Sequence, residues 1–399
     1  MTKKFNRVIS LVIIFITIMS SLTSFYAADL EGVSDRIHGA LLGDLETGEI
    51  LYEYNVDEAL PLASISKLIT YSILMDKITE GKIKYDDEMT ISENAAKTQG
   101  SKFGMKAGEK IKVSTMIDAL LVISGNDVTT AIAEHIAGTE EEFVKMMYEK
   151  SKSLGLNSVH FINSHGYPLD DAETDQNYMS IKDLYAFVRY LLSTYPQVLE
   201  ISKKTELVIP ERNFNKKSTN PLFGNEIQGV DGLKTGYTDK AGICLVSTMP
   251  IKAKDQNSKD FRIIAIIMGA QTHPERIEKS KKLLEYGRDN YIDQKLSNKE
   301  EVYDKIHIDN AKVQDINVYA KEDYNKLTEV GQTVRVEKTY NEKIKAPLAN
   351  GAKIGEINYY IGEEKIKTID IEIREDVKKA NFFVMIGRFF QNLFKSWFK

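Results

Sequence analysis

The chain has 399 residues, of which 42% are hydrophobic and 28% charged, with a formal net charge of −5. This composition excludes a disordered or fibrous chain and leaves room for two globular domains. Charges of both signs are mixed along the sequence, so we expect no nucleic-acid partner. The single cysteine, Cys244, excludes an internal disulfide, and no H-E-x-x-H pair suggests a zinc hydrolase. We therefore expect neither a metal nor a cofactor.

The N-terminus predicts export. Three basic residues occur among the first seven, and an almost unbroken apolar run, residues 8–19, follows them. Small residues then lead to Ala28, a layout typical of a secretory signal peptide, which we assign to residues 1–28. The run is short for a membrane span, which needs about 20 apolar residues. An uncleaved N-terminal anchor is the alternative.

Residues 29–293 predict one α+β domain. Strands are expected at both ends of this segment and helices between them, which favours an antiparallel sheet flanked by helices. A Glu46-Thr47-Gly48 turn separates the first two strands. The expected strands lie within residues 39–54 and at 243–249 and 261–269, and the expected helices begin near Ser64 and lie at 113–137, 139–155 (behind Thr139) and 274–291.

The C-terminal part of the chain predicts a different architecture. A short polar stretch, residues 294–301, suits a linker. Alternating apolar and polar residues at 312–319, 333–338 and 365–373 are typical of strands, so we expect a small all-β domain over residues 300–376.

Residues 377–399 predict an amphipathic helix. Aromatic and aliphatic side chains recur on one face, whereas Arg388, Lys395 and Lys399 recur on the opposite face. No acidic residue follows Asp376. A basic helix with Phe and Trp on its apolar side is suited to a membrane interface. The alternative is a terminal helix that packs on the β domain.

Three short motifs carry the chemistry of the chain. The first two are weak singly, because S-x-x-K recurs at residues 396–399 and S-x-N recurs at Ser92 and Ser218, whereas K-T-G occurs once. Their order and their positions on predicted elements make the set specific. The motifs are Ser64-Ile65-Ser66-Lys67, Ser124-Gly125-Asn126 and Lys234-Thr235-Gly236.

The first motif suits nucleophilic catalysis. A serine that attacks an acyl group must lose its proton to a nearby base. On a helix, residues three apart share a face, which places the Lys67 amine beside the Ser64 hydroxyl. Lysine acts as a base only when neutral, and burial near another cation such as Lys234 would lower its pKa. Ser66 is the competing hydroxyl, but it would point off that face.

The other two motifs suit substrate binding and proton transfer. Ser124 and Asn126 follow a predicted apolar helix, in a glycine-containing loop. The Ser124 hydroxyl could pass a proton to the leaving amine, and the Asn126 amide could hold the substrate and orient the base. Gly236 on an edge-facing strand would let a peptide approach closely. Positive charge and hydroxyls at this strand would bind a free carboxylate, at Lys234, Thr235 and Thr238.

This order of motifs resembles that of the penicillin-binding and serine β-lactamase superfamily. Within it, the chain resembles the low-molecular-mass D-alanyl-D-alanine carboxypeptidases. Residues 62–67, 121–127 and 230–238 carry the resemblance, with support from 163–166 and 241–242. The layout is also similar: a signal peptide, a penicillin-binding/β-lactamase-like catalytic domain, a small all-β domain and an amphipathic C-terminal helix.

The resemblance implies a role for each motif residue. Ser64 would be the acylated nucleophile, Lys67 its general base and Ser124 the proton shuttle. Asn126 and the strand residues would bind the peptide, and the Ser64 and Tyr237 backbone N–H groups would form the oxyanion hole. The implied substrate-binding residues are Asn126, Lys234, Thr235, Gly236, Tyr237 and Thr238.

The resemblance also implies the partners. The enzyme would remove the terminal D-alanine from peptidoglycan stem peptides through an acyl-enzyme, at the outer face of the cytoplasmic membrane or in the cell wall. β-Lactams would inhibit it because they mimic the D-Ala-D-Ala end and leave a slowly hydrolysed ester. Alternatives are a β-lactamase and a catalytically silent penicillin-sensing or wall-binding protein. Endopeptidase activity also stays open.

Two positions depart from the expected family pattern. Residues 173–177 match the E-x-x-x-N pattern of class A β-lactamases, in which the glutamate activates the deacylating water. Here the segment lies in an Asp-rich loop, further from the serine motif than that role requires. Met179-Ser180 replaces the family's Ser-Thr, and we expect Ser180 to cap a helix.

Overall fold

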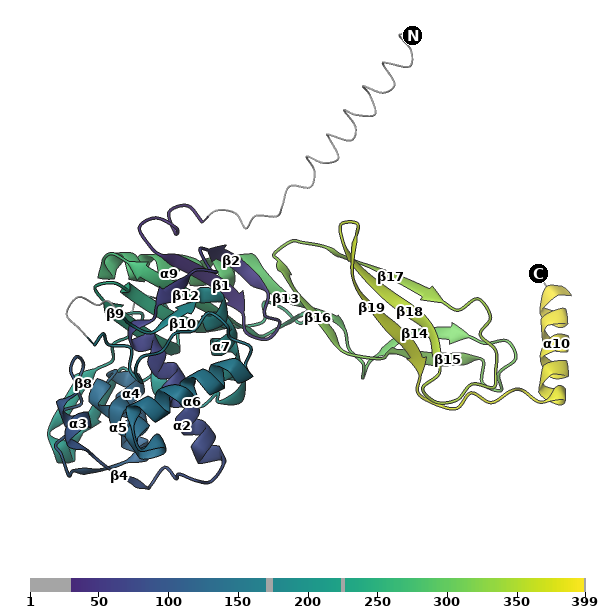
Figure 1. Ribbon diagram of the computed structural model, residues 1–399. Coiled ribbons are helices and arrows are strands. Elements are labelled where there is room, and N and C mark those ends of the chain that lie inside the picture. Colours follow the sequence, from purple (N-terminus) through teal and green to yellow (C-terminus); the bar gives the residue numbers. More distant parts are fainter. Residues whose placement is uncertain (1–29, 170–174, 224–226, 398–399) are drawn as a thin grey trace, which may run out of the picture. The chain divides into compact units, whose positions relative to one another are not determined.

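The computed structural model describes residues 30–169, 175–223 and 227–397 (Figure 1). The chain divides into two compact units. The first comprises the described residues up to Ile251 together with Arg262–Gly287, and the second comprises Lys252–Phe261 together with the described residues from Arg288 onward. The predicted signal peptide lies outside the described residues, as does Glu173, the candidate deacylating glutamate.

A five-stranded sheet forms the centre of the first unit. Its strands β1 and β12 pair antiparallel, as do β1 and β2, and β10 and β9. The predicted strands at 39–54, 243–249 and 261–269 are confirmed. β12 is buried along almost its whole length, because both of its faces are covered. In sheet order the strands are β2 (Ile50–Tyr54), β1 (Gly39–Asp44), β12 (Phe261–Ala270), β10 (Gly242–Ile251) and β9 (Gly232–Thr238).

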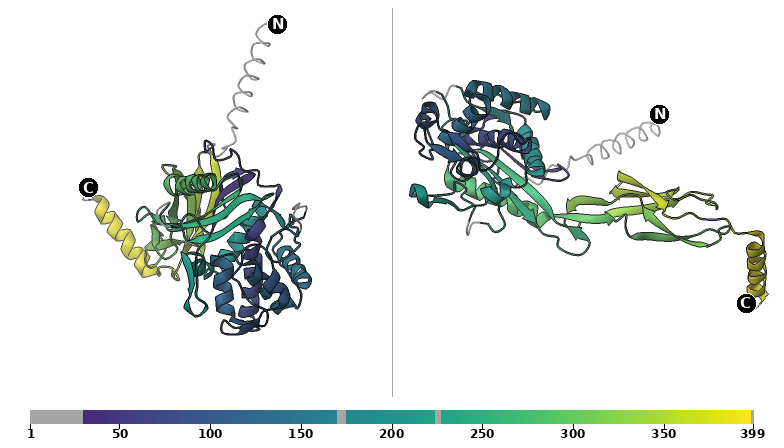
Figure 2. Two further views of the ribbon diagram at one scale, coloured as in Figure 1. Left: turned by 90° about the vertical axis from the view of Figure 1, so that its left-hand side faces the viewer. Right: turned by 90° about the horizontal axis from the view of Figure 1, so that it is seen from below.

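Helices cover both faces of this sheet (Figures 1 and 2). A Cβ atom on Gly43 of β1 would lie 2.4 Å from the Tyr185 hydroxyl, so α7 (Ile181–Thr194) packs closely on that face. On the opposite face, a Cβ on Gly287 of α9 (His273–Asn290) would lie 3.2 Å from Leu42 Cδ2. Because neighbouring residues 42 and 43 point to opposite faces of a strand, the two helices enclose it. The predicted α+β class is confirmed.

The helical layer surrounds α2, which is buried along most of its length. One expectation was wrong, because the helix predicted over residues 113–137 is interrupted at Ser124 and Gly125. Ser124 has φ +59°, a left-handed conformation that no α-helix accommodates. The helices and 3₁₀ turns of this layer are η1 (Ala63–Ser66), α2 (Lys67–Thr79), α3 (Glu93–Lys97), α4 (Val113–Val122), α5 (Asn126–Ala137), α6 (Glu140–Ser153), α8 (Val198–Ser202) and η2 (Pro210–Arg212).

Short two-stranded pairs complete the first unit. The pair β3–β6 leads into α7, whose N-terminus is capped by Ser180, because the Ser180 hydroxyl accepts a hydrogen bond from Asp183 N at 3.2 Å. The predicted cap is confirmed. These pairs are β3 (Ala59–Pro61) with β6 (Tyr178–Ser180), β4 (Glu88–Thr90) with β5 (Lys110–Lys112), and β7 (Glu206–Ile209) with β8 (Phe214–Lys217).

The second unit is built from two antiparallel sheets, and the predicted all-β architecture is confirmed. The linker expected at residues 294–301 was partly wrong. Its first residues belong to β13, because Gln294 and Lys295 pair with Lys326 and Asn325 of β16. The three-stranded sheet has the order β11 (Ser258–Lys259), β13 (Tyr291–Ser297), β16 (Tyr324–Glu329), and the five-stranded sheet has the order β14 (Val302–His307), β15 (Asp315–Ala320), β19 (Glu364–Ile373), β18 (Lys353–Ile361), β17 (Val334–Tyr340).

The C-terminal segment forms the helix α10 (Phe382–Trp397), as predicted. Several apolar side chains in the described part of this helix are exposed, with Phe382 at 71% and Phe383 at 82%. Arg388, from the predicted basic face, donates through its guanidinium to the Ala311 and Lys312 carbonyls, each at 2.8 Å. Among the described residues, no helix is both long and apolar enough to cross a membrane.

The cap of α6 allows a direct test of the fold. Thr139 Oγ1 accepts from Glu142 N at 3.2 Å. We expect Thr139→Ala to lower the free energy of unfolding by about 1 kcal/mol, because one N-terminal N–H loses its partner. Chemical denaturation followed by circular dichroism measures this. Lys152→Ala on the same exposed helix is the control, with a change within about 0.5 kcal/mol. Equal effects of the two substitutions would contradict the capping role.

Candidate active site

The candidate nucleophile lies where the chain enters the helical layer. Ser64 is in the 3₁₀ turn η1, and the α-helix itself begins three residues later, at Lys67. The Lys67 amine lies 2.6 Å from the Ser64 hydroxyl, so the two groups share one face as expected. The Ser66 hydroxyl is fully buried and donates to the Ala63 carbonyl at 2.8 Å, which removes it as a competing nucleophile.

Two further groups fix the position of the Lys67 amine. It lies 2.6 Å from Asn126 Oδ1 and 3.2 Å from the His165 carbonyl. The Asn126 amide is itself held, because its Nδ2 donates to the Gln99 carbonyl at 2.6 Å. Asn126 therefore orients the lysine, as the sequence predicted.

Burial lowers the pKa of Lys67 well below its usual value. Removal from water disfavours the charged amine, and the nearby charge of Lys234 lowers the pKa further. The carboxylate of Asp127 opposes this shift only in part. The direction agrees with the expectation from the sequence, and it favours the neutral form that a general base requires.

The second motif meets the third at the Ser124 hydroxyl. Ser124 lies between α4 and α5, and its hydroxyl accepts a hydrogen bond from Lys234 Nζ at 2.8 Å. The Lys234 amine also donates to the Thr235 carbonyl at 3.0 Å. Burial lowers the pKa of Lys234 to about 7, and the charge of Arg276 adds to this effect. The three motifs thus converge on one site.

Arg276 is a residue that the sequence analysis missed. It lies on α9 and is only 6% exposed, and its Nε is buried without a hydrogen-bond partner among the described residues. A guanidinium in such a place is costly unless an anion compensates it. Because arginine on a helix is usually exposed, the sequence of α9 gave no reason to expect a buried side chain at this position.

The strand β9 lies at the edge of the central sheet, as predicted. Gly236 makes room for η1, because a Cβ at this position would lie 2.9 Å from the Leu62 carbonyl, and the approach of a peptide to this strand stays a prediction. Thr238 is also buried, and its hydroxyl donates to Gln176 Oε1 at 2.8 Å. Tyr237 is 57% exposed, and its hydroxyl donates to Asp239 at 2.6 Å.

Two other supporting residues were not singled out from the sequence. Asp127 is fully buried. Its carboxylate accepts hydrogen bonds from the backbone N–H groups of Phe103 and Gly104, at 2.9 and 2.8 Å, and so fixes the loop that contains these two residues. His165 is buried as well, which lowers its pKa to about 3. In the sequence, the signal for either residue was an acidic side chain or an imidazole close to a motif, and its burial became visible only in the structure.

Comparisons with known proteins agree with this geometry. A family model described as D-alanyl-D-alanine carboxypeptidase matches residues 34–272. The chain belongs to this family. A second model, described as penicillin-binding protein 5, C-terminal domain, matches residues 291–379. The chain is therefore a serine-type D-Ala-D-Ala carboxypeptidase of the low-molecular-mass penicillin-binding type, and neither the β-lactamase nor the silent-sensor alternative has support from these matches.

Individual relatives of the carboxypeptidase match between 63% and 96% of the chain. D-alanyl-D-alanine carboxypeptidase DacF of Bacillus subtilis is 32% identical, over 96% of this chain and 97% of its own length. The structure of penicillin binding protein 5 from Haemophilus influenzae superposes with a TM-score of 0.67 at 26% identity, covering 86% of this chain and 98% of that one. The ampicillin-bound structure of penicillin-binding protein D2 from Listeria monocytogenes is 30% identical, with a TM-score of 0.52, and covers 63% and 96%.

The buried lysine makes stability depend on pH. An unfolded lysine titrates near pH 10.5, whereas Lys234 in the folded carboxypeptidase has a pKa of about 7. Between these values the unfolded chain binds a proton that the folded chain does not, so rising pH favours folding. We expect the wild type to gain stability over Lys234→Met between pH 7 and pH 9. Urea denaturation at several pH values measures this, and parallel pH curves would contradict it.

Proposed function

We propose that this carboxypeptidase uses Ser64 as nucleophile and Lys67 as general base to release the terminal D-alanine of peptidoglycan stem peptides. The observation that carries the proposal is the buried Lys67 amine, 2.6 Å from the Ser64 hydroxyl. A neutral amine has two N–H donors and one lone pair. Asn126 Oδ1 and the His165 carbonyl accept the two donors, so the lone pair faces the serine proton.

The proton then needs a route to the leaving amine. As the Ser64 oxygen bonds to the substrate carbonyl carbon, its proton passes to Lys67. When the peptide C–N bond breaks, the Ser124 hydroxyl protonates the departing D-alanine nitrogen and takes up the proton that Lys67 received from Ser64, which returns Lys67 to its neutral form. Lys234, at 2.8 Å from that hydroxyl, holds it in position. Water later cleaves the ester bond and releases the shortened peptide.

Positive charge and backbone donors would bind the substrate. We assign the terminal carboxylate to Lys234 and Thr235, with the guanidinium of Arg276 adding its charge, because both cationic side chains are buried and Arg276 Nε has no hydrogen-bond partner among the described residues. The backbone N–H groups of Ser64 and Tyr237 would stabilise the oxyanion, which is the largest single contribution in many acyl-transfer enzymes. Asn126 would contact the acyl side of the peptide.

β-Lactams would acylate the same serine. The ring carbonyl would take the place of the scissile carbonyl, and the opened ring would stay attached to Ser64 because its leaving group cannot diffuse away. The ampicillin-bound form of the Listeria protein supports this assignment for a related catalytic domain. A D-Ala-D-Ala peptide and a β-lactam would therefore compete for one site.

The nucleophile is tested by labelling. We expect a fluorescent penicillin to attach to the wild type at Ser64, located by mass mapping, and Ser64→Ala to lose both labelling and D-alanine release. Ser66→Ala is the matched control, because that hydroxyl is tied to a backbone carbonyl. It should keep the label. Attachment at any other residue, or an adduct that persists in Ser64→Ala, would refute the assignment.

We further propose that the protein is exported and held at the outer face of the cytoplasmic membrane by α10. The exposed apolar side chains Phe382, Phe383, Met385, Ile386 and Phe390 support this proposal. Phenylalanine on an amphipathic helix is suited to the boundary between headgroups and acyl chains. Arg388 connects the helix to the carbonyls of residues 311 and 312, so membrane attachment and packing on the β domain are compatible.

Truncation tests the anchor. We expect the chain ending at Asp376 to pellet no longer with anionic vesicles, because it loses the exposed aromatic side chains. The double variant Phe382→Ser/Phe383→Ser should bind vesicles more weakly than the wild type, and Val313→Ser, an exposed apolar residue elsewhere in the second unit, is the control. Unchanged sedimentation of the truncated chain would rule out the helix as anchor.

A further inference from the structure

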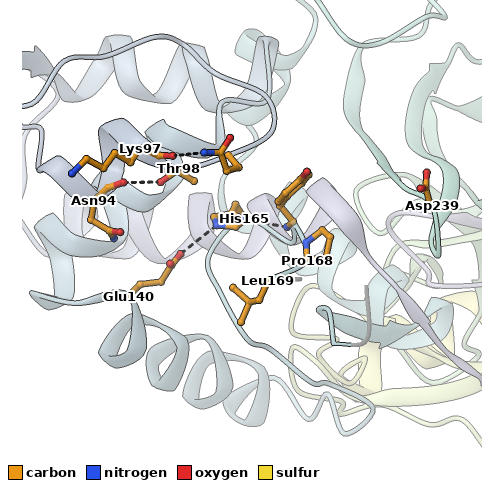
Figure 3. A pocket seen from close by; sticks show the side chains of 10 residues that line it. Asn94, Lys97, Thr98, Glu140, His165, Pro168, Leu169 and Asp239 are labelled. Atoms are coloured by element: carbon orange, nitrogen blue, oxygen red, sulfur yellow. Dashed lines mark hydrogen bonds and ion pairs between the residues drawn. The ribbon is translucent and has the colours of Figure 1, made fainter. Parts of the chain in front are cut away.

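Residues 163–166 lie against the general base of the first unit. This segment reaches the base through its backbone, because the His165 carbonyl lies 3.2 Å from the Lys67 amine. The His165 imidazole, by contrast, lies beside Glu140 in the lining of a cavity of about 690 Å³ (Figure 3). The way in which the base is held therefore depends on what fixes this one carbonyl.

The His165 carbonyl has a defined task under the proposed function. A neutral amine has two N–H donors and one lone pair. Asn126 Oδ1 accepts one N–H of Lys67 at 2.6 Å, and the His165 carbonyl accepts the other. If this carbonyl turned away, the freed N–H would compete with the lone pair for the Ser64 hydroxyl, which is 2.6 Å from the amine. The direction of the carbonyl is therefore part of the mechanism.

This direction is fixed from the other side of the same peptide group. The peptide group that joins His165 to Gly166 is planar and trans, so its N–H and its C=O point in opposite directions. The Gly166 N–H donates to Asn163 Oδ1 at 2.6 Å. Because the N–H is held on one side, the carbonyl points to the other side, where the Lys67 amine lies.

Asn163 holds this segment with both ends of its side-chain amide. Its Oδ1 accepts a second, longer hydrogen bond from His165 N at 3.2 Å, and its Nδ2 donates to the Tyr167 carbonyl at 2.7 Å. Asparagine is suited to this task, because its side chain readily accepts from backbone N–H groups two or three residues further on. The residue is 1% exposed, so these bonds are shielded from water.

A second buried asparagine fixes Asn163 in turn. Asn177 Nδ2 donates to the Asn163 carbonyl at 2.9 Å, and Asn177 Oδ1 accepts from Ile162 N at 2.8 Å. The Asn177 carbonyl also accepts from Leu62 N at 2.8 Å, two residues before Ser64. The two asparagines therefore connect the segment that holds the base to the segment that carries the nucleophile.

We propose that Asn163 is a positioning residue for the general base, Lys67. By holding the Gly166 N–H, it directs the His165 carbonyl at the amine, and the lone pair of the amine then faces the Ser64 hydroxyl. The inference rests on the function proposed above, in which Lys67 takes the proton of the nucleophile. Because Asn163 acts through one peptide group, its loss should slow the chemical step and leave ligand binding unchanged.

The rate of acylation tests this role. We expect Asn163→Ala to lower the rate constant for acylation by a fluorescent penicillin about 10- to 100-fold, because a misdirected base loses much of its contribution to the rate. The dissociation constant of the noncovalent penicillin complex should change by less than about twofold, since the interaction is needed only in the chemical step. Rapid mixing over a range of penicillin concentrations separates the two constants.

Two further variants separate positioning from the stability of the segment. Asn163→Ser keeps a hydroxyl that accepts from backbone N–H groups more weakly, so its acylation rate should lie between those of Asn163→Ala and the wild type. Thr70→Val is the matched control, because Thr70 Oγ1 donates at 2.7 Å to the Ser164 carbonyl, one peptide group earlier. It should lower the free energy of unfolding but keep the wild-type acylation rate. If Asn163→Ala does not fold, Asn163→Ser carries the test.

The outcomes separate this inference from the proposed function. A wild-type acylation rate in Asn163→Ala, or in Asn163→Ser where only that variant folds, would overturn the positioning role, while labelling at Ser64 would uphold the mechanism. A loss confined to the dissociation constant, or an equal loss of rate in Thr70→Val, would also overturn the role. If penicillin does not label the wild type at Ser64, both the role and the proposed mechanism are wrong.

Discussion

The burial of the Lys67 amine is the constraint on which the rest of the site depends. In water this amine would be charged and would not act as a base, whereas its buried position at the start of α2 favours the neutral form. Neutrality leaves one lone pair, and the acceptors Asn126 and the His165 carbonyl determine that it faces Ser64. The elements around Lys67 position these hydrogen-bond partners: Asn126 is the first residue of α5, and His165 lies in the loop at 165–169.

Local backbone conformation determines the direction of site groups that do not lie on a regular helix. Ser124 adopts φ +59° between two helices, a conformation that costs a non-glycine residue energy and that turns its hydroxyl toward Lys234. Gly166 has φ +77°, and a Cβ there would lie 1.9 Å from the Ala63 carbonyl, so only glycine lets the loop approach η1. Two non-glycine residues with positive φ, Ala63 and Ser124, therefore lie at the candidate site, where the surrounding core can support them.

Two cationic side chains are buried in the first unit. Lys234 and Arg276 are 1% and 6% exposed, and the charge of Arg276 adds to the effect of burial in lowering the pKa of Lys234. Under the proposed function, the carboxylate of the substrate would compensate these buried cations. The second unit contributes a separate β architecture and an exposed aromatic helix.

The sequence alone determined the order of domains, the α+β class, most strands and the residues Ser64, Lys67, Ser124 and Lys234, because these depend on local periodicity and on short motifs. Only the tertiary structure showed that Arg276 is buried, that Gly236 makes room for η1 and that residues 294–297 pair as a strand. These features arise from contacts between segments far apart in the chain. Composition and spacing indicate which face of its own helix or strand a side chain occupies. Which distant segment packs against that face is determined only by the tertiary structure.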